Sequence, residues 1–358
     1  MSRYYTAIIF MSVFSMVVMG MCVLTSNTLA RDKKKLFFIL YATIALASLC
    51  EWLGLWLQNA DIRLRWLHIA VKAVELSVAP LTGVTVGLIV RQPKRWKLLC
   101  ALLILHALLE CASGVFGFIY RVDGQNLYSH ADFYWIYVCA YIFSGIYAMA
   151  ATLSTLKKYQ YSGLPFLILM VGYVVAGLTV QFFENSLHLD WLTLSVTGIL
   201  LYIFNSEMVQ QTDALTQLIN RRGYETILGR VQGRVAILFF DVDKFKEVND
   251  NYGHVYGDHC LKTIGECIWD VYGRWGKCFR IGGDEFCVVL ERNLEGVEEM
   301  NTALFRRLGD ERARDGHLPF VSVGYVHYDP SNCSVRDAVK EADAMMYEYK
   351  ARNRNRSG

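Results

Sequence analysis

Long apolar runs, separated by short polar segments, fill the first 204 residues of this 358-residue chain. A helix needs about 20 apolar residues to cross the roughly 30 Å hydrocarbon core of a bilayer, and most of the runs reach that length. We therefore predict seven membrane-spanning helices. They are Tyr5–Leu24, Leu36–Leu57, Leu67–Val90, Leu98–Phe118, Phe133–Leu156, Leu164–Phe183 and Trp191–Phe204. After Phe204 the composition becomes mixed and charged, which is typical of a domain in water.

Basic residues in the short loops predict the orientation of these helices. The loops after the first, third and fifth predicted spans carry ten of them: Arg31, Lys33, Lys34, Lys35, Arg91, Lys94, Arg95, Lys97, Lys157 and Lys158. The opposite side carries four: Arg3, Arg63, Arg65 and Arg121. Because basic residues stay on the cytoplasmic side, we expect the N-terminus outside and everything after Phe204 in the cytoplasm.

The ten cysteines are scattered and form no Cys-x-x-Cys or Cys/His metal spacing. A reducing cytoplasm disfavours disulfides, so we interpret the cysteines as small apolar residues. The formal net charge of +3 is modest, and membrane topology accounts for the basic residues. We therefore expect no nucleic-acid partner.

Strand-like and helix-like segments alternate irregularly after Phe204. Strands are expected at Arg234–Asp241, Lys277–Ile281, Phe286–Leu290 and Phe320–Tyr328, with helices at 244–272, 294–314 and 334–353. The second and third strands form a hairpin. This order favours an α+β domain with an antiparallel-rich sheet over a doubly wound sheet.

Carboxylates gather at strand ends in this domain. Asp241 closes an apolar strand, and Asp284 and Glu285 lie in the hairpin turn. If the two strands are neighbours, these acids and Asp243 converge, which is costly without a cation. Hard oxygen ligands of this kind suit Mg²⁺, which takes its other ligands from water and phosphate.

Four segments, in order, resemble the motifs of the GGDEF diguanylate cyclases. They are "DALTQLINRRGYE" (213–225), "FFDVDKFKEVNDNYGHVYGDHCL" (239–261), "IGGDEF" (281–286) and "ADAMMYEYKARNRNR" (342–356). The resemblance implies a nucleotidyl cyclase-like domain at 215–358. We assign 1–204 to a seven-helix transmembrane, sensor-like domain and 205–214 to a signalling-helix linker.

The resemblance also implies roles for individual residues. Mg²⁺, or Mn²⁺ in its place, would be held by Asp241, the Val242 carbonyl and Asp284. The implied catalytic residues are Asp284, Glu285 and Lys246. GTP would be bound by Asn249, His254, Asp258, Gly282, Gly283, Lys350 and Arg354. Asp258 can accept hydrogen bonds from guanine but not from the N1 of adenine, and the paired glycines let a nucleotide approach the backbone.

The implied reaction joins two GTP molecules into cyclic di-GMP and releases two pyrophosphates. Each domain binds one GTP, so a homodimer in a bacterial inner membrane is expected. Many family members carry an Arg-x-x-Asp product-binding site before the signature, but "GRWG" (273–276) stands here. Weak or absent feedback inhibition by that route is therefore expected. Gln217 and Asn353 also replace customary glycines.

Ionisable residues inside the predicted spans are expensive and rarely face lipid. Glu51, Lys72, Glu75, His106 and Glu110 either form a polar pocket that senses a ligand or pair with one another inside the bundle. The last span contains no proline or glycine after Gly198, so it is expected to continue into the catalytic domain as one helix. Ile203, Met208 and Leu215 would then form a dimer seam.

Two other functions stay open at this point. The chain could be a catalytically silent receptor for GTP or cyclic di-GMP. It could also be a transporter or channel with a regulatory domain, although the sequence shows no inverted repeat.

Overall fold

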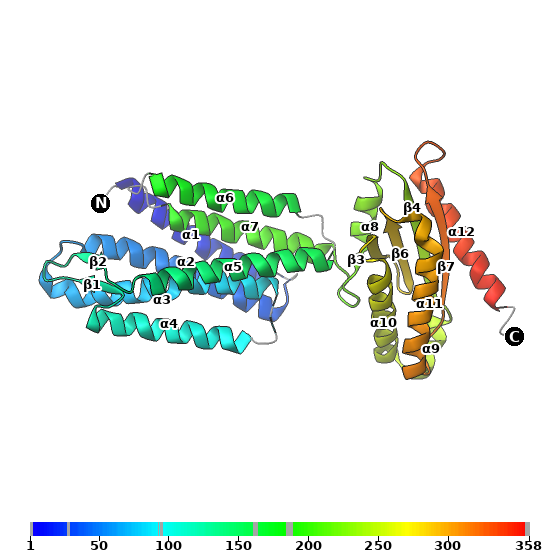
Figure 1. Cartoon of the computed structure of the whole chain (residues 1–358), viewed down its shortest axis with the longest axis horizontal. Helices are drawn as coiled ribbons and strands as arrows, with labels where there is room; N and C mark the ends of the chain where they lie inside the picture. Colours follow the sequence, from blue (N-terminus) through cyan, green and yellow to red (C-terminus); the bar gives the residue numbers. More distant parts are fainter. Residues whose placement is uncertain are drawn as a thin grey trace. The chain divides into compact units, whose positions relative to one another are not determined.

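The computed structural model describes residues 3–26, 29–91, 93, 96–159, 164–183 and 189–354. The chain forms two compact units, Met1–Glu207 and Met208–Gly358 (Figure 1). Each is described by itself.

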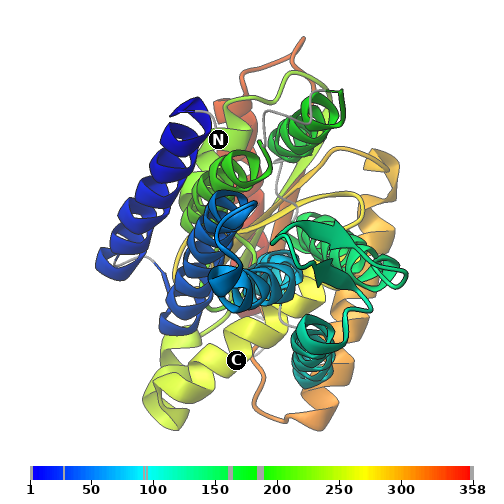
Figure 2. The ribbon, with the colours of Figure 1, turned by 90° about the vertical axis from the view of Figure 1, so that its left-hand side faces the viewer.

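Helices make up most of the first unit. Its described α-helices are α1 (Arg3–Thr25), α2 (Arg31–Leu57), α3 (Arg65–Val90), α4 (Trp96–Phe116), α5 (Trp135–Tyr159), α6 (Leu164–Phe183) and α7 (Asp190–Gln210). A 3-10 turn, η1 (Ile62–Leu64), precedes α3. Helix α3 packs against α2, α4 and α5, whereas α1 lies at one edge of the bundle in Figure 2.

Over the described residues, six of these helices are long and apolar enough to cross a membrane. Helix α6 contributes a shorter apolar stretch, Ile168–Gly177, so the predicted count of seven is not confirmed. The predicted orientation depends partly on residues outside the described part: Lys94, Arg95 and the side chains of Arg3, Lys157 and Lys158. The orientation therefore stays a prediction.

A small hairpin that the sequence did not predict joins α4 to α5. It consists of β1 (Tyr120–Val122) and β2 (Tyr128–His130), paired antiparallel. Side chains fix it to α3: the Tyr120 hydroxyl donates to the Ile69 carbonyl (3.1 Å), and Arg65 Nε donates to the Val122 carbonyl (2.9 Å).

A five-stranded sheet organises the second unit, in the order β3-β5-β6-β4-β7. The strands are β3 (Ile219–Asn220), β4 (Val235–Val242), β5 (Gly276–Arg280), β6 (Glu285–Leu290) and β7 (Val321–Tyr328). Only β3 and β5 are paired parallel among the named strands. The described helices are α8 (Arg221–Leu228), α9 (Phe245–Tyr252), α10 (His254–Tyr272), η2 (Leu294–Gly296), α11 (Val297–Arg314) and α12 (Val335–Arg354). The predicted antiparallel-rich α+β fold is confirmed.

Both faces of this sheet are covered, which explains why β4 is apolar along nearly its whole length. Alternate residues of β4, such as Leu238 and Phe240, pack into a core with α10 and α11. The residues between them, such as Ile237 and Phe239, pack into a second core with α8 and α12. Because side chains alternate along a strand, Asp241 lies on the same face as Phe239, toward α12.

Helix α7 ends at Gln210. The chain then turns, and the Asp213 carboxylate accepts a hydrogen bond from the Thr216 backbone N–H (2.8 Å), an alternative to helical bonding. Leu215 packs against the core of the second unit. Helix α7 thus continues as one helix past Phe204 to Gln210, but Leu215 lies beyond its end, so the predicted seam cannot include Leu215. The seam through Ile203 and Met208 stays a prediction.

Candidate active site

Three acids meet at one edge of the sheet in the second unit. The antiparallel register of β4 and β6 places Asp241 directly opposite Glu285. The Val242 backbone N–H donates to the Asp284 carbonyl, 3.1 Å away. The sheet thus brings the end of β4 against the hairpin turn, which is the strand pairing on which the expected convergence of the acids depends.

Crowding of negative charge is evident at Glu285. Burial raises the pKa of this carboxyl, and the nearby Asp284, Asp241 and Asp343 raise it further, whereas Arg221 opposes the change. The Lys350 ammonium on α12 forms an ion pair with Asp241. Asp243, which we expected beside these acids, accepts a hydrogen bond from the Ser322 hydroxyl (2.8 Å), and Ser322 is the residue of β7 directly opposite Asp241.

The donor set fits Mg²⁺. Asp241, the Val242 carbonyl and Asp284 supply only hard oxygen atoms, and the mutual repulsion of the acids favours a cation. Among the described residues, no three His, Cys, Asp or Glu side chains lie close enough to hold a metal by themselves. An ion here would therefore need ligands from water or phosphate, which is how Mg²⁺ is commonly bound.

The two glycines of the turn differ in their surroundings. A Cβ on Gly282 would lie 2.4 Å from Glu285 Oε2. The lack of a side chain at Gly282 therefore leaves room for the Glu285 carboxylate beside the turn. A Cβ on Gly283 would have no atom within 4 Å. Gly283 thus presents bare backbone at an open surface.

Arg280 fixes the back of this turn, and the sequence analysis did not single it out. Its guanidinium donates to the Gly283 carbonyl (2.8 Å) and forms an ion pair with Asp213 (3.1 Å). Asp213 is the first residue of the first of the four motifs, and that position is the sequence signal that could have identified this ion pair. The pair ties the hairpin to the segment that follows α7.

The predicted guanine-binding residues lie on α9 and α10. Gly253, with φ +82°, separates the two helices. A Cβ on Gly257 would lie 2.0 Å from Asn249 Oδ1, so the absence of a side chain lets α10 pack closely against Asn249. Asp258, next along the chain, is exposed, as are His254 and Lys246. The structure therefore brings Asn249 beside the first turn of α10.

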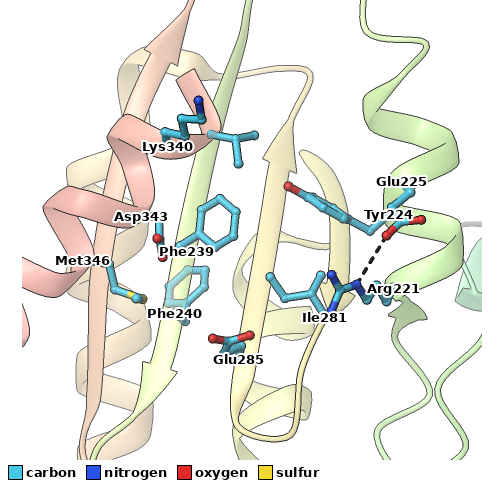
Figure 3. Close-up of a pocket in the computed structure, with 11 residues that line it drawn as sticks. Arg221, Tyr224, Glu225, Phe239, Phe240, Ile281, Glu285, Lys340, Asp343 and Met346 are labelled. Carbon is cyan, nitrogen blue, oxygen red and sulfur yellow. Dashed lines mark hydrogen bonds and ion pairs between the residues drawn. The ribbon is translucent and has the colours of Figure 1, made fainter. Parts of the chain in front are cut away.

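A cavity of about 280 Å³ lies next to the acids, between α8 and α12 (Figure 3). Glu285 lies at one end, Phe239 forms part of the floor, and Arg221 and Asp343 approach from opposite sides. The sequence analysis did not name Arg221 or Asp343 individually, although both belong to quoted motifs. Lys350 lies on α12 beyond them, whereas the side chain of Arg354 lies outside the described residues.

The ionisable residues of the first unit are largely paired within it. Lys72 Nζ lies 2.8 Å from Glu75 Oε2, and His106 Nε2 lies 3.6 Å from Glu110 Oε1. Glu51 on α2 also has an interaction partner. Internal pairing, one of the two readings of these residues, is thus present in the bundle.

Comparison with known proteins defines the class of the second unit. Residues 210–356 match the family described as "Diguanylate cyclase, GGDEF domain". The second unit is therefore a GGDEF domain, preceded in this chain by membrane-capable helices.

Two curated relatives are diguanylate cyclases. The chain is 34% identical over 161 residues to diguanylate cyclase DgcS of Shewanella oneidensis, which covers 40% of this chain and 50% of DgcS. It is 34% identical over 162 residues to diguanylate cyclase DgcP of Escherichia coli, covering 41% and 47%. The chain thus spans about half the length of these relatives. A similar solved structure is the GGDEF domain of DgcB from Caulobacter crescentus in complex with c-di-GMP, with 26% identity, coverage of 39% and 90%, and a TM-score of 0.35.

Proposed function

We propose that the chain is a membrane-bound diguanylate cyclase that converts two GTP molecules into cyclic di-GMP and two pyrophosphates. The observation that carries the proposal is the register of β4 and β6, which places Asp241 opposite Glu285 and Val242 against Asp284 within a GGDEF domain. The relatives named diguanylate cyclases support the same activity.

The residues of the site have distinct roles in this proposal. Asp241, the Val242 carbonyl and Asp284 would hold Mg²⁺, which would supply positive charge to the phosphate oxygens and a Lewis acid for the attacking hydroxyl. Asn249 and Asp258 bind guanine, with His254 lining the nucleotide. Lys246, Lys350 and Arg354 offset phosphate charge. Glu285, whose pKa is raised, is suited to exchange a proton at a higher pH than an ordinary glutamate.

Two domains must face each other, because each binds one GTP. We therefore propose a homodimer, with the GGDEF domains in the cytoplasm and the N-terminus outside a bacterial inner membrane. Regulation by a signal at the membrane helices belongs to the same proposal. A catalytically silent receptor for GTP or cyclic di-GMP is the alternative, disfavoured because the acids of the signature are all present.

Analysis of the reaction products distinguishes the cyclase from the silent receptor. The full-length chain, reconstituted in lipid nanodiscs, is incubated with GTP and Mg²⁺, and the nucleotides are identified by mass spectrometry. We expect cyclic di-GMP from the parent chain and at least about 100-fold less from Asp284→Ala, because even the groups around metal ligands contribute 10- to 100-fold. GTP binding without turnover in both proteins would support the receptor and contradict the cyclase.

A further inference from the structure

The turn between α9 and α10 carries the residues assigned to guanine. Asn249 lies on α9, and His254 and Asp258 lie in the first turns of α10. Gly253, with φ +82°, interrupts the helical path between the two helices. The direction of α10 relative to α9 therefore depends on contacts that their side chains make. Several of these contacts are with the segment that follows α11, far along the chain.

Asp315, directly after α11, accepts a hydrogen bond from α10. The Tyr256 hydroxyl donates to Asp315 Oδ1 at 2.6 Å, a distance typical of a charge-assisted bond to a carboxylate. His259 Nε2 lies 3.5 Å from the other carboxylate oxygen. The hydrogen bond from Tyr256 is the main cause that lowers the pKa of Asp315, and His317 and His259 contribute. Asp315 is thus an ionised acceptor at neutral pH, which strengthens its bond to Tyr256.

His317 makes a second contact, with α9. Its ring stacks on the Tyr252 ring, with centroids 4.6 Å apart and planes 29° apart. The Tyr252 hydroxyl also lies 3.0 Å from His317 Nδ1, within hydrogen-bond distance. Either tautomer of histidine permits this bond, because a tyrosine hydroxyl both donates and accepts. Each of the two helices is therefore fastened by a tyrosine to residues 315–317.

The same segment is fixed to the end of β4. Arg312 Nε donates to the Leu318 carbonyl (2.9 Å), which holds the segment against α11. The Phe320 carbonyl accepts a hydrogen bond from the Asp243 N–H (2.8 Å). Asp243 directly follows β4, at the strand end assigned to the metal. Residues 315–320 thus connect the turn that carries the guanine-binding residues with the edge of the sheet that carries the acids.

The fastened face of α10 is not the face assigned to guanine. Tyr256 and His259 are three residues apart and share one face of the helix. Asp258 is two residues from Tyr256, which is about 200° around the helix axis. A Cβ on Gly257 would lie 2.0 Å from Asn249 Oδ1, so Asn249 packs against the same turn of α10. The contacts with residues 315–317 can therefore set the position of Asp258 and Asn249 without occupying their face.

We propose that Asp315 and His317 are positioning residues that determine selectivity for guanine. Through Tyr256 and Tyr252 they hold the α9–α10 turn at a fixed distance from the end of β4. Asp258 then meets the N1 and N2 hydrogens of guanine while the triphosphate reaches the acids. The inference rests on the proposed binding of GTP at these helices, but not on closure of the cyclic product.

The test compares nucleotides that differ in the amine that Asp258 would bind. Inosine triphosphate keeps the N1 hydrogen of GTP and lacks the N2 amine. The full-length chain in lipid nanodiscs is titrated by calorimetry with the α,β-methylene analogues of both nucleotides, which cannot release pyrophosphate. Tyr256→Phe removes the bond to Asp315 and keeps the ring. We expect it to bind the GTP analogue roughly 3- to 10-fold more weakly, with a smaller preference over the inosine analogue.

Turnover gives a second readout on the same variant. A residue that only positions the guanine site should change the KM for GTP by a similar factor and leave kcat within about twofold of the parent value. Tyr252→Phe, which removes the hydroxyl near His317, should change affinity in the same direction. Asp315→Asn keeps an acceptor for Tyr256, so it should retain most of the affinity and preference that Asp315→Ala loses.

Tyr325→Phe is the matched control. Its hydroxyl donates to Glu298, which lies at the opposite end of α11 from Asp315. Removing this hydroxyl should leave affinity, preference and KM unchanged. Differential scanning fluorimetry on each variant shows that it is folded at the temperature of the titration.

Unchanged affinity and preference in folded Tyr256→Phe and Asp315→Ala would overturn the proposal. An equal loss in Tyr325→Phe would also overturn it, since that result describes general loosening of the domain. Absence of binding in the folded parent chain would do the same. Binding that responds to the variants in a chain that forms no cyclic di-GMP would support the positioning role and contradict the cyclase, so the two failures are distinguishable.

Discussion

Gly283 shows how one residue can separate folding from function. Its φ lies outside the left-handed region and a Cβ there meets no atom within 4 Å, so the fold has no evident need of glycine at this position. We predict that Gly283→Ala leaves thermal unfolding unchanged, within about 0.5 kcal/mol, yet lowers the rate of cyclic di-GMP formation. Differential scanning fluorimetry and product analysis on one sample check both parts; full activity would mean that no nucleotide approaches this backbone.

Glu285 leads to a prediction on pH. Its pKa is raised, so its carboxyl loses the proton above the ordinary range, and a reaction that needs the ionised form should gain rate as pH rises through the raised pKa. Asp343→Asn removes a charge that raises this pKa, so the acidic limb of kcat/KM should move to lower pH. Arg221→Gln removes a charge that lowers it, so the limb should move to higher pH.

The pH–rate profiles of the parent and both variants provide the measurement. Opposite displacements support Glu285 as the titrating group. Displacements in the same direction, or no displacement in either variant, would assign the limb to another group.

Sequence reasoning succeeded best for the acids of the signature, because turn chemistry fixes where a hairpin reverses and an apolar strand fixes where its neighbour ends. It did not identify the partner of Asp243, because Ser322 lies on β7, far along the chain. Arg280 was missed for the same reason: its importance lies in a pairing with Asp213 that only the fold brings together.

At the scale of elements, the contact of β7 with α12 holds Lys350 in place. A Cβ on Gly324 of β7 would lie 2.0 Å from the Met346 backbone nitrogen and 2.5 Å from the Ala342 carbonyl oxygen. Backbone atoms cannot rotate away, so Gly324→Ala should displace α12 and cost about 1–3 kcal/mol. Hydrogen exchange of β7 amides, followed by mass spectrometry, should then be roughly 5- to 150-fold faster.

Gly309→Ala on α11 is the matched control, because its Cβ would meet no atom within 4 Å. Helix propensity predicts a neutral or slightly stabilising effect there. Equal exchange in the two variants would show that the contact of β7 with α12 tolerates a side chain.

The window in which the product-binding motif is missing is closely packed. A Cβ on Gly276 would lie 2.2 Å from the Val289 carbonyl oxygen, and one on Gly273 would lie 2.5 Å from the Trp269 carbonyl oxygen. Glycine at these two positions thus lets β5 pack closely against β6 and lets α10 end with its backbone close to Trp269.

Elements were predictable where length and periodicity are strong. Each predicted span corresponds to a helix of the first unit, because apolar runs of this length have few other stable forms. The β1–β2 hairpin was not predicted, because strands of three residues leave almost no pattern in the sequence and the hairpin is stabilised by contacts with α3. The end of α7 at Gln210 was not predicted, because no Pro or Gly marks it. The turn that follows is instead bonded by the Asp213 side chain.

At the scale of the molecule, the chain joins membrane-capable helices to a GGDEF domain. The identity of the product that this domain forms from GTP is the central test of the proposed function. A cyclase that joins two GTP molecules releases two pyrophosphates for each ring closed. A GTPase would release orthophosphate, and an enzyme that fails to close the ring would release one pyrophosphate for each linear dinucleotide.

The most direct measurement is therefore the product stoichiometry of the full-length chain with GTP and Mg²⁺, followed by phosphorus NMR. The account predicts pyrophosphate and cyclic di-GMP in a ratio of two to one throughout the reaction. Orthophosphate as the main product, or no consumption of GTP by an inserted and folded chain, would contradict it.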